Sequence, residues 1–154
     1  MGNTLTKQKI EDELSVSGVV ATNTVGVSMK PLFKTHRDAV VLKKPDRALG
    51  KYDVVLYKNS TGRYVLHRVI GEKNGVFIIR GDNTFEREYV PKEDILAYMI
   101  SFNRRGKSHT VVEVGYKAYS RVWNFIYPVR FFAHKVLSLL RKIKKALFGR
   151  KKQR

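Results

Sequence analysis

The chain has no cysteine among its 154 residues, which excludes a disulfide-stapled scaffold, a thiolate zinc site and a cysteine nucleophile. Acidic residues are also scarce: 13 Asp and Glu stand against 31 Lys and Arg, a formal net charge of +18. A chain this basic is expected to bind an anionic partner, either nucleic acid or an acidic membrane face. The hydrophobic content of 43% is sufficient for a buried core and indicates a globular domain.

Long apolar runs are missing as well. No stretch before residue 100 approaches the roughly 18 consecutive apolar residues that a membrane-spanning helix needs. We therefore expect neither a secretory signal nor a spanning helix at the N-terminus. Residues 1–15 are polar, and Gly2 with Thr6 matches the short M-G-x-x-x-[ST] myristoylation pattern, which alone does not predict lipidation.

The middle of the chain carries short β-branched and aromatic runs separated by turn signals, which is typical of successive strands. These runs cover residues 16–20, 39–42, 52–57, 64–70, 76–79, 95–102 and 110–114. The pair Asn74-Gly75 predicts a type I′ hairpin between the fourth and fifth runs, because both central residues of that turn need a positive φ. No strand–helix–strand alternation occurs, which argues against a doubly wound α/β fold. We predict a polar segment over 1–15, a mainly β domain over 16–114 and a basic helical tail over 115–154.

The tail holds most of the excess charge. From Tyr116 to the end the chain has twelve Lys or Arg and no Asp or Glu. At 100° per residue most of the tail's apolar residues fall on one face and many of its charges on the other, which predicts an amphipathic helix that Pro128 begins or kinks. Arg130, His134 and Lys135 interrupt every window long enough to span a bilayer, so we expect the helix to lie at the membrane surface.

Two groups of tail residues are expected to make that contact. Trp123, Phe125, Phe131 and Phe132 are expected to insert, and Lys135, Lys142 and Lys145 to lie over anionic head groups. Two other interpretations stay open: the helix packs on the protein's own core, or it binds nucleic acid. Nucleic acid fits less well, because base stacking needs aromatic rings beside the charges.

Three separate segments supply Ser28, His67 and Asp82, the residue types of a hydrolytic triad. A hydroxyl becomes a nucleophile when a base takes its proton, histidine is the usual base near neutrality, and a carboxylate fixes the imidazole tautomer. Residue types alone are weak support, because serine often serves in turns and histidine often fills a core. Such chemistry predicts neither a metal ion nor a cofactor.

The motifs around these residues are more specific. They are, in order, Ser28-Met29-x-Pro31 before a strand, His67-Arg-Val-Ile-Gly, Gly-Asp82-Asn83, and Val90-Pro-x-Glu-x-Ile. As an ordered set they resemble the signal peptidase I family over roughly residues 18–100. The histidine resembles the archaeal and eukaryotic branch, whereas bacterial members use lysine. The resemblance implies the β-ribbon fold shared with LexA-type self-cleaving repressors, and an endopeptidase that cuts after a small-x-small sequence.

Carried onto this chain, the resemblance makes Ser28 the nucleophile and His67 its general base. Met29 and Pro31 would shape the turn that presents the serine, and the N–H of Ser28 would help to bind the oxyanion.

The resemblance also bears on the nearby acidic residues and on Gly26. Asp82 would either orient His67 or hold the Gly-Asp-Asn turn that includes Asn83. Gly26 stands where many relatives have a Ser or Thr that joins the oxyanion hole. Glu86 is a possible substitute carboxylate, and Asp38 is expected to be structural.

We therefore expect a membrane-associated serine endopeptidase that cleaves precursor peptides or proteins after small residues. The substrate would add as a strand beside an edge near Ser28. The family's N-terminal anchor is not seen in the sequence, so the tail is expected to replace it, and its polybasic character favours the cytoplasmic face. The alternatives are a self-cleaving LexA-type peptidase, and a non-catalytic basic module that binds membrane or nucleic acid.

Overall fold

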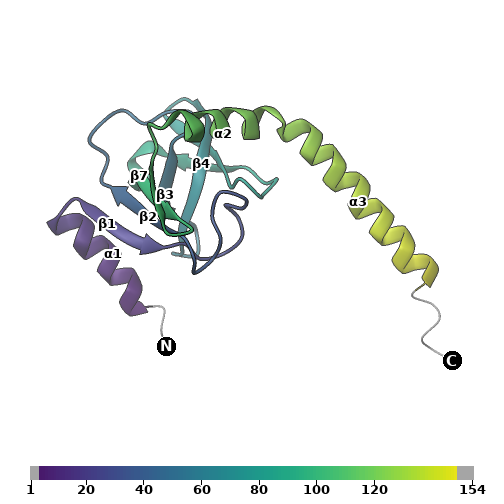
Figure 1. Ribbon diagram of the computed structural model, residues 1–154, viewed down its shortest axis with the longest axis horizontal. Coiled ribbons are helices and arrows are strands. Elements are labelled where there is room, and N and C mark those ends of the chain that lie inside the picture. Colours follow the sequence, from purple (N-terminus) through teal and green to yellow (C-terminus); the bar gives the residue numbers. More distant parts are fainter. Residues whose placement is uncertain (1–3, 149–154) are drawn as a thin grey trace. The chain divides into compact units, whose positions relative to one another are not determined.

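The computed structural model describes residues 4–148, with side chains described for residues 10–144. The described part is mainly β, as predicted, with eight strands joined in one antiparallel sheet and three α-helices (Figure 1). The elements are α1 (Thr4–Val16), β1 (Val19–Asn23), β2 (Ala39–Lys43), β3 (Val54–Lys58), β4 (Tyr64–Lys73), β5 (Val76–Arg80), β6 (Glu88–Pro91), a 3-10 turn (Lys92–Asp94), β7 (Ile95–Arg104), β8 (Lys107–Thr110), α2 (Val114–Phe125) and α3 (Tyr127–Phe148).

The sheet curls through the order β1-β2-β7-β3-β4-β5-β6, with β8 added to β7. The predicted hairpin at Asn74-Gly75 is confirmed: Lys73 pairs with Val76, and the two turn residues have φ values of 52° and 78°. Two strand edges near each other in the fold are left without a partner among the described residues. β1 pairs only with β2, and residues 64–67 of β4 pair only with β3.

Several boundaries differ from the sequence-based expectation. The polar segment over 1–15 contains α1, whose Leu14 is buried beside Val20 of β1. The short strands β6 and β8 were not predicted, because each has only four residues and weak apolar patterning. In place of the expected strand over 110–114, β8 ends at Thr110, residues 111–113 form a turn, and α2 begins at Val114.

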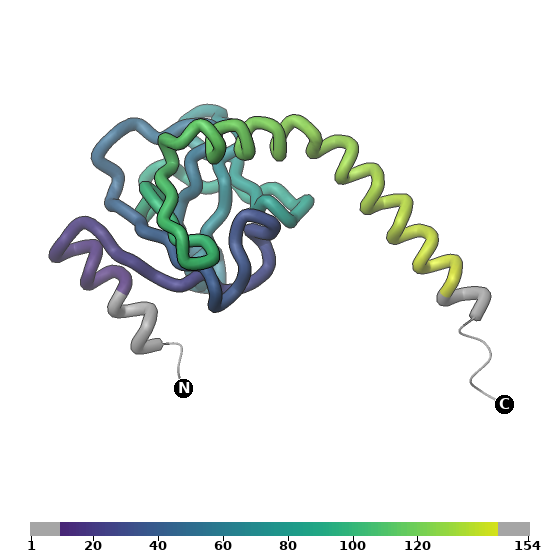
Figure 2. The backbone as a smooth tube through the Cα atoms, in the orientation of Figure 1, coloured from purple at the N-terminus to yellow at the C-terminus, as the bar shows by residue number. Residues whose placement is uncertain are grey.

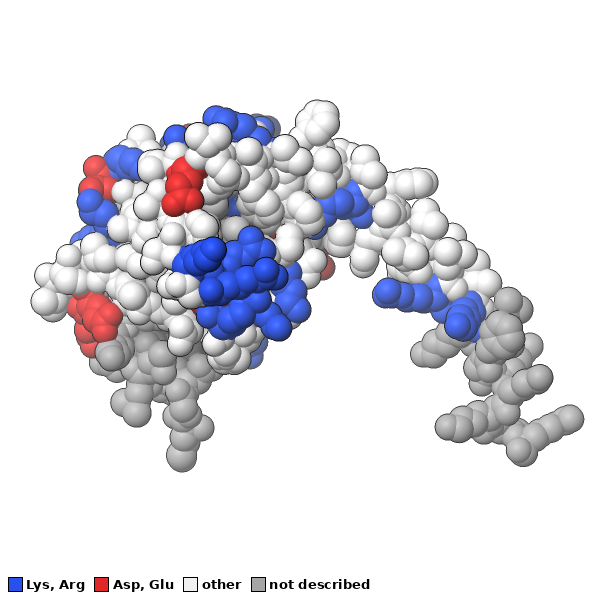
Figure 3. Space-filling model, viewed as in Figure 1, with Lys and Arg blue, Asp and Glu red and all other residues white. Residues whose placement is uncertain are grey.

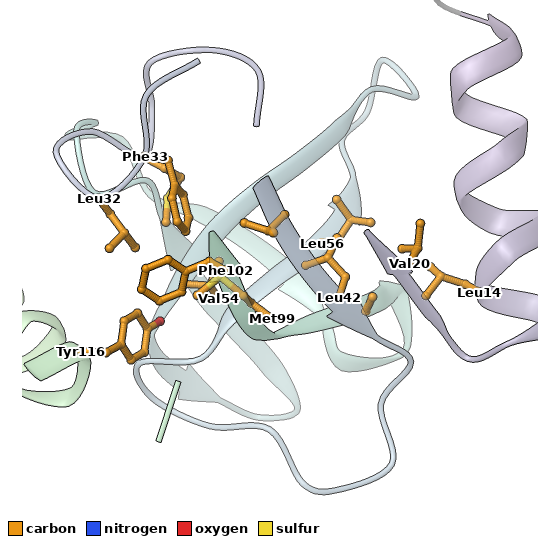
Figure 4. Close-up of a cluster of buried hydrophobic side chains, with 13 residues drawn as sticks. Leu14, Val20, Leu32, Phe33, Leu42, Val54, Leu56, Met99, Phe102 and Tyr116 are labelled. Carbon is orange, nitrogen blue, oxygen red and sulfur yellow. The ribbon is translucent and has the colours of Figure 1, made fainter. Parts of the chain in front are cut away.

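Two clusters of buried side chains form the core of the β-domain. The larger one joins Leu14 of α1 to the inner face of β2, β3 and β7 and to Tyr116 of α2 (Figure 4). In this cluster the Phe33 and Phe102 rings meet edge to face, with centroids 5.4 Å apart. The smaller cluster takes side chains from β3 to β7 and includes Tyr57, Phe77 and Ile79. The core therefore holds both the loop before β2, which carries Ser28, and the start of α2.

The chain divides into two compact units, residues 1–121 and 122–154. The predicted boundary at residue 115 thus lies before the division, because the first turns of α2 pack on the β-domain through Tyr116 and Ser120, which are buried. Pro128 is the second residue of α3, as expected for a residue that lacks an N–H and begins a helix well. Within the described residues, no helix combines the length and apolarity that crossing a bilayer requires.

Candidate active site

Ser28 lies in the loop between β1 and β2, and several hydrogen bonds fix its backbone. Its carbonyl accepts from the Asn83 N–H at 2.6 Å, and the Val27 carbonyl accepts from the Asn83 side chain at 3.2 Å. The Val27 carbonyl also accepts from Lys30 at 3.2 Å, which closes a tight turn over Ser28 and Met29. Met29 is buried in the core beneath this turn, and Pro31 follows a cis peptide bond.

Asp38 anchors the other end of the same loop, in agreement with its expected structural role. Its carboxylate is fully buried and accepts from the Lys34 N–H at 2.7 Å and the Arg105 N–H at 3.2 Å. Hydrogen bonds from Arg37 lower the pKa of Asp38 to about 2. The turn between β7 and β8 consequently lies beside the Ser28 loop (Figure 2).

Gly81 brings Ser28 and His67 to one place. A Cβ at this position would lie 2.8 Å from the Ser28 carbonyl oxygen and 3.0 Å from Nε2 of His67. The two residues therefore flank the same glycine, and only the absence of a side chain there allows this approach. Both also line one groove. Within the described residues the Ser28 hydroxyl makes no hydrogen bond, so Oγ and Nε2 are not joined. Catalytic hydrogen bonds of unliganded enzymes often tighten only when substrate binds.

The opposite nitrogen of His67 contacts a carboxylate that sequence reasoning missed. Nδ1 lies 2.9 Å from Glu88 at the start of β6 and 3.3 Å from the Tyr57 hydroxyl. Burial raises the pKa of Tyr57, so the phenol stays protonated and donates to Glu88. With Glu88 accepting the Nδ1 proton, Nε2 carries the lone pair and faces Gly81. Glu86, the carboxylate considered from the sequence, is exposed two residues earlier.

Burial dominates the electrostatics of His67. It lowers the pKa of the imidazole below its ordinary value, while the charges of Glu88 and Asp82 act in the opposite direction. The imidazole is therefore neutral at pH 7 and able to accept a proton.

Asp82 takes a different position from the one expected of a residue that orients His67. Its carboxylate accepts two hydrogen bonds of 2.8 Å from Arg68 and one of 2.9 Å from Tyr119. Arg68 is fully buried, and its remaining N–H groups donate to Ser120 at 2.9 Å, Tyr116 at 3.1 Å and the Tyr52 carbonyl at 3.0 Å. Asp82 thus holds the Gly-Asp-Asn turn and ties it to α2, which is the structural alternative considered for it.

The oxyanion donor expected from the sequence is the backbone N–H of Ser28. The Ser28 N–H donates to no acceptor within the described residues. Gly26 adopts a φ of 94° with open space around it, and its carbonyl accepts from Thr35. Gly26 therefore supplies no side-chain donor, as its residue type implied.

The groove that contains Ser28 and His67 measures about 580 Å³ and is mostly apolar. One wall is the edge of β1 around Thr22 and Asn23, and the other is the first half of β4 from Tyr64 to His67, where the only strand paired with β4 in the described part of the chain is β3. Its floor consists of core side chains from the Ser28 loop and from strands β2 and β3: Met29, Phe33, Val40, Leu42 and Leu56. Ile10 of α1 reaches into the groove, and Glu11 forms an ion pair with Lys58 at 2.5 Å.

The tail residues expected at a membrane fall into two sets. Phe125 and Phe132 are 85% and 70% exposed, and Lys135 and Lys142 are exposed as well. The Arg130 guanidinium lies over the Trp123 ring, 3.8 Å from the ring centroid, so this ring is covered and is not part of the exposed apolar face. Phe131 is likewise covered, by Lys135 at 4.8 Å. The Lys145 side chain lies outside the described residues.

Comparisons with known proteins do not identify a family for this chain. No protein-family model matches the chain, and no curated protein matches it. In the part of the chain that the structure describes, no three side chains of metal-ligating type come together.

Proposed function

We propose that this protein is a serine endopeptidase in which Ser28 is the nucleophile, His67 the general base and Glu88 the carboxylate that orients the base. We further propose that its sheet is the peptidase fold of signal peptidases and LexA-type repressors. One observation carries the proposal: a buried imidazole has a carboxylate on Nδ1 and faces, on Nε2, the glycine against which the Ser28 backbone is seated. The ordered motifs around Ser28, His67 and Gly81 support the same assignment.

In the proposed reaction, Nε2 of His67 takes the Ser28 Oγ proton while Oγ attacks the carbonyl carbon of the scissile peptide. The Ser28 N–H donates to the developing oxyanion, a contact typically worth about 10²–10³ in rate. The imidazolium then gives its proton to the leaving amine, and water hydrolyses the acyl-enzyme by the same base. Glu88 stabilises the imidazolium that forms in both steps.

The groove supports an extended peptide as substrate. Its two walls are strand edges that lack a second neighbouring strand among the described residues, β1 and residues 65–67 of β4, and such edges can hydrogen-bond an extended peptide. Main-chain pairing recognises extended segments of varied sequence, and small side chains next to the cut site would fit close to the Ser28 turn. A peptide with alanine at the first and third positions before the cut is therefore the expected substrate class.

The test is cleavage of a peptide library with small-x-small sites, read by mass spectrometry. We expect Ser28→Ala and His67→Ala each to abolish cleavage, while circular dichroism shows that both variants stay folded. Ser60→Ala and His36→Ala, at exposed positions, serve as matched controls with full activity. A fluorophosphonate probe should label Ser28 in the wild-type chain only. Normal turnover in purified Ser28→Ala would refute the assignment.

We also propose that the tail brings the peptidase to the cytoplasmic face of an anionic membrane. Support comes from the exposed apolar side chains along α2 and α3, which recur at helical spacing: Val122, Phe125, Val129, Phe132, Val136, Leu139, Leu140 and Ile143. Lysines and arginines gather along another side of the tail helix (Figure 3). An apolar face beside a row of cations fits the boundary between acyl chains and anionic head groups.

A further inference from the structure

A cavity of about 350 Å³ lies between the first turns of α2 and the loop that precedes β3. α2 contributes Tyr116, Lys117, Ser120 and Arg121, the loop contributes Arg47, Lys51, Tyr52 and Asp53, and the floor includes Val54, Met99 and Val111. No residue lines both this cavity and the Ser28 groove. The cavity is therefore a separate site on the β-domain.

Three of the four basic residues that line this cavity are not neutralised by an acidic side chain among the described residues. Asp53 is its single acidic residue and is already engaged, by Arg47 at 2.8 Å and by the Gly50 N–H at 2.9 Å. Within the described residues, Lys51, Lys117 and Arg121 form no ion pair. Lys117 and Arg121 are four residues apart on α2, a spacing at which like charges destabilise a helix. An anion bound between them would remove this repulsion.

The chemistry of the lining favours a phosphate group. A hollow lined by lysine and arginine side chains suits an anion with several oxygens and more than one negative charge. The aromatic faces are already covered, Tyr52 by Lys51 at 5.3 Å and Tyr116 by Arg68 at 5.6 Å. A cation therefore already lies over each of the two aromatic rings that line the cavity, which disfavours base stacking there.

Apolar side chains beside the cations point to the source of that phosphate. Val112 lines the cavity and is 68% exposed, and the neighbouring Val114 is 83% exposed. Exposed valines next to a cationic hollow suit the level of a bilayer where head groups meet acyl chains. Arg121 also directly precedes Val122, where the amphipathic tail begins.

We propose that the cavity beneath α2 binds a phosphate group, supplied by the head group of an anionic phospholipid or by a soluble phosphate ester. The lipid source rests on the membrane association proposed above, whereas the phosphate site does not. The two sources are distinguished by testing the same variants with soluble phosphate and with vesicles.

The site is tested first without lipid, on the full chain labelled with ¹⁵N. Glycerol 3-phosphate and inorganic phosphate, added at constant ionic strength, should cause saturable amide shifts at Lys51, Lys117 and Arg121. Lys117→Gln/Arg121→Gln should weaken this binding at least tenfold. The control Lys44→Gln/Lys73→Gln removes two exposed charges elsewhere and should stay within twofold of wild type. No saturable shift, or an unchanged affinity in the Lys117/Arg121 pair, overturns the site.

The lipid source is tested by co-sedimentation with vesicles of phosphatidylcholine containing phosphatidylglycerol. Two lost cations should weaken binding about 25-fold, since each basic residue near such a surface contributes about fivefold. The control pair should lose much less, and an equal loss in both pairs overturns a lipid-specific site. If the wild-type chain binds phosphate and Lys117→Gln/Arg121→Gln leaves vesicle binding unchanged, the source of the phosphate is the soluble ester. If the wild-type chain binds phosphate but does not bind vesicles, the proposed membrane association is refuted and the phosphate site is retained.

Discussion

Replacing Glu88 by glutamine tests whether Glu88, rather than the Asp82 expected from the sequence, orients His67. The substitution keeps the size of the side chain and an acceptor oxygen but removes the negative charge 2.9 Å from Nδ1 of His67. The Glu88 side chain is 37% exposed, so an effective dielectric constant of about 40 is appropriate, between a buried site and water. At that value the charge stabilises the imidazolium by about 3 kcal/mol. We therefore expect kcat to fall about 100-fold.

The pH dependence gives a second readout that a merely structural role would not change. The base is active when neutral, and burial lowers the pKa of His67 below 6.5, so wild-type activity should persist below that pH and fall as pH drops through the lowered value. Glu88 acts to raise this pKa. Its replacement should therefore move the acidic limb of kcat/KM to still lower pH while the plateau falls.

The assay is hydrolysis of an internally quenched Ala-x-Ala peptide between pH 4 and 9, with Glu86→Gln as the matched control. Glu86 is exposed, and its replacement should leave both the plateau and the acidic limb unchanged. The reasoning fails if Glu88→Gln stays within threefold of wild type, or if the Glu86 variant carries the loss instead.

Three further predictions concern the support of the site and the tail. Gly81→Ala should lower kcat/KM at least 100-fold, because the added Cβ would lie 2.8 Å from the Ser28 carbonyl oxygen. The control Gly71→Ala, whose added Cβ would have its nearest neighbour at 3.7 Å, should be nearly neutral in the same assay. Arg68→Met should lower the free energy of urea unfolding by about 3–5 kcal/mol, because it leaves the buried Asp82 carboxylate without its partner; a loss below 1 kcal/mol would contradict this. Phe125→Ser/Phe132→Ser should weaken vesicle binding at least 100-fold, since each buried aromatic contributes about 1.5–3 kcal/mol. An unchanged partition would rule out this face.

The network around Arg68 explains why the start of α2 belongs to the β-domain. Arg68 follows His67 on β4, and its guanidinium links the Asp82 turn to the hydroxyls of Tyr116 and Ser120. Burial lowers the pKa of Arg68, but the hydrogen bonds and charge of Asp82 outweigh it and keep the group charged. A boundary drawn from charge composition alone places these residues in the tail, because the basic stretch without Asp or Glu already begins by Tyr116, before the division at residue 121.

Local signals were enough to predict the mainly β class, the Asn74-Gly75 hairpin and the start of a helix at Pro128, because turn chemistry and proline geometry act within a few residues. The order of motifs also pointed to Ser28 and His67 as candidates. Which carboxylate reaches the imidazole was decided only by the tertiary structure. Asp82 lies next to the Gly81 contact in sequence but is taken by Arg68, while the pairing of β6 with β5 brings Glu88 to Nδ1. Which charged groups pair depends on distances between neighbouring strands, and a single sequence does not contain those distances.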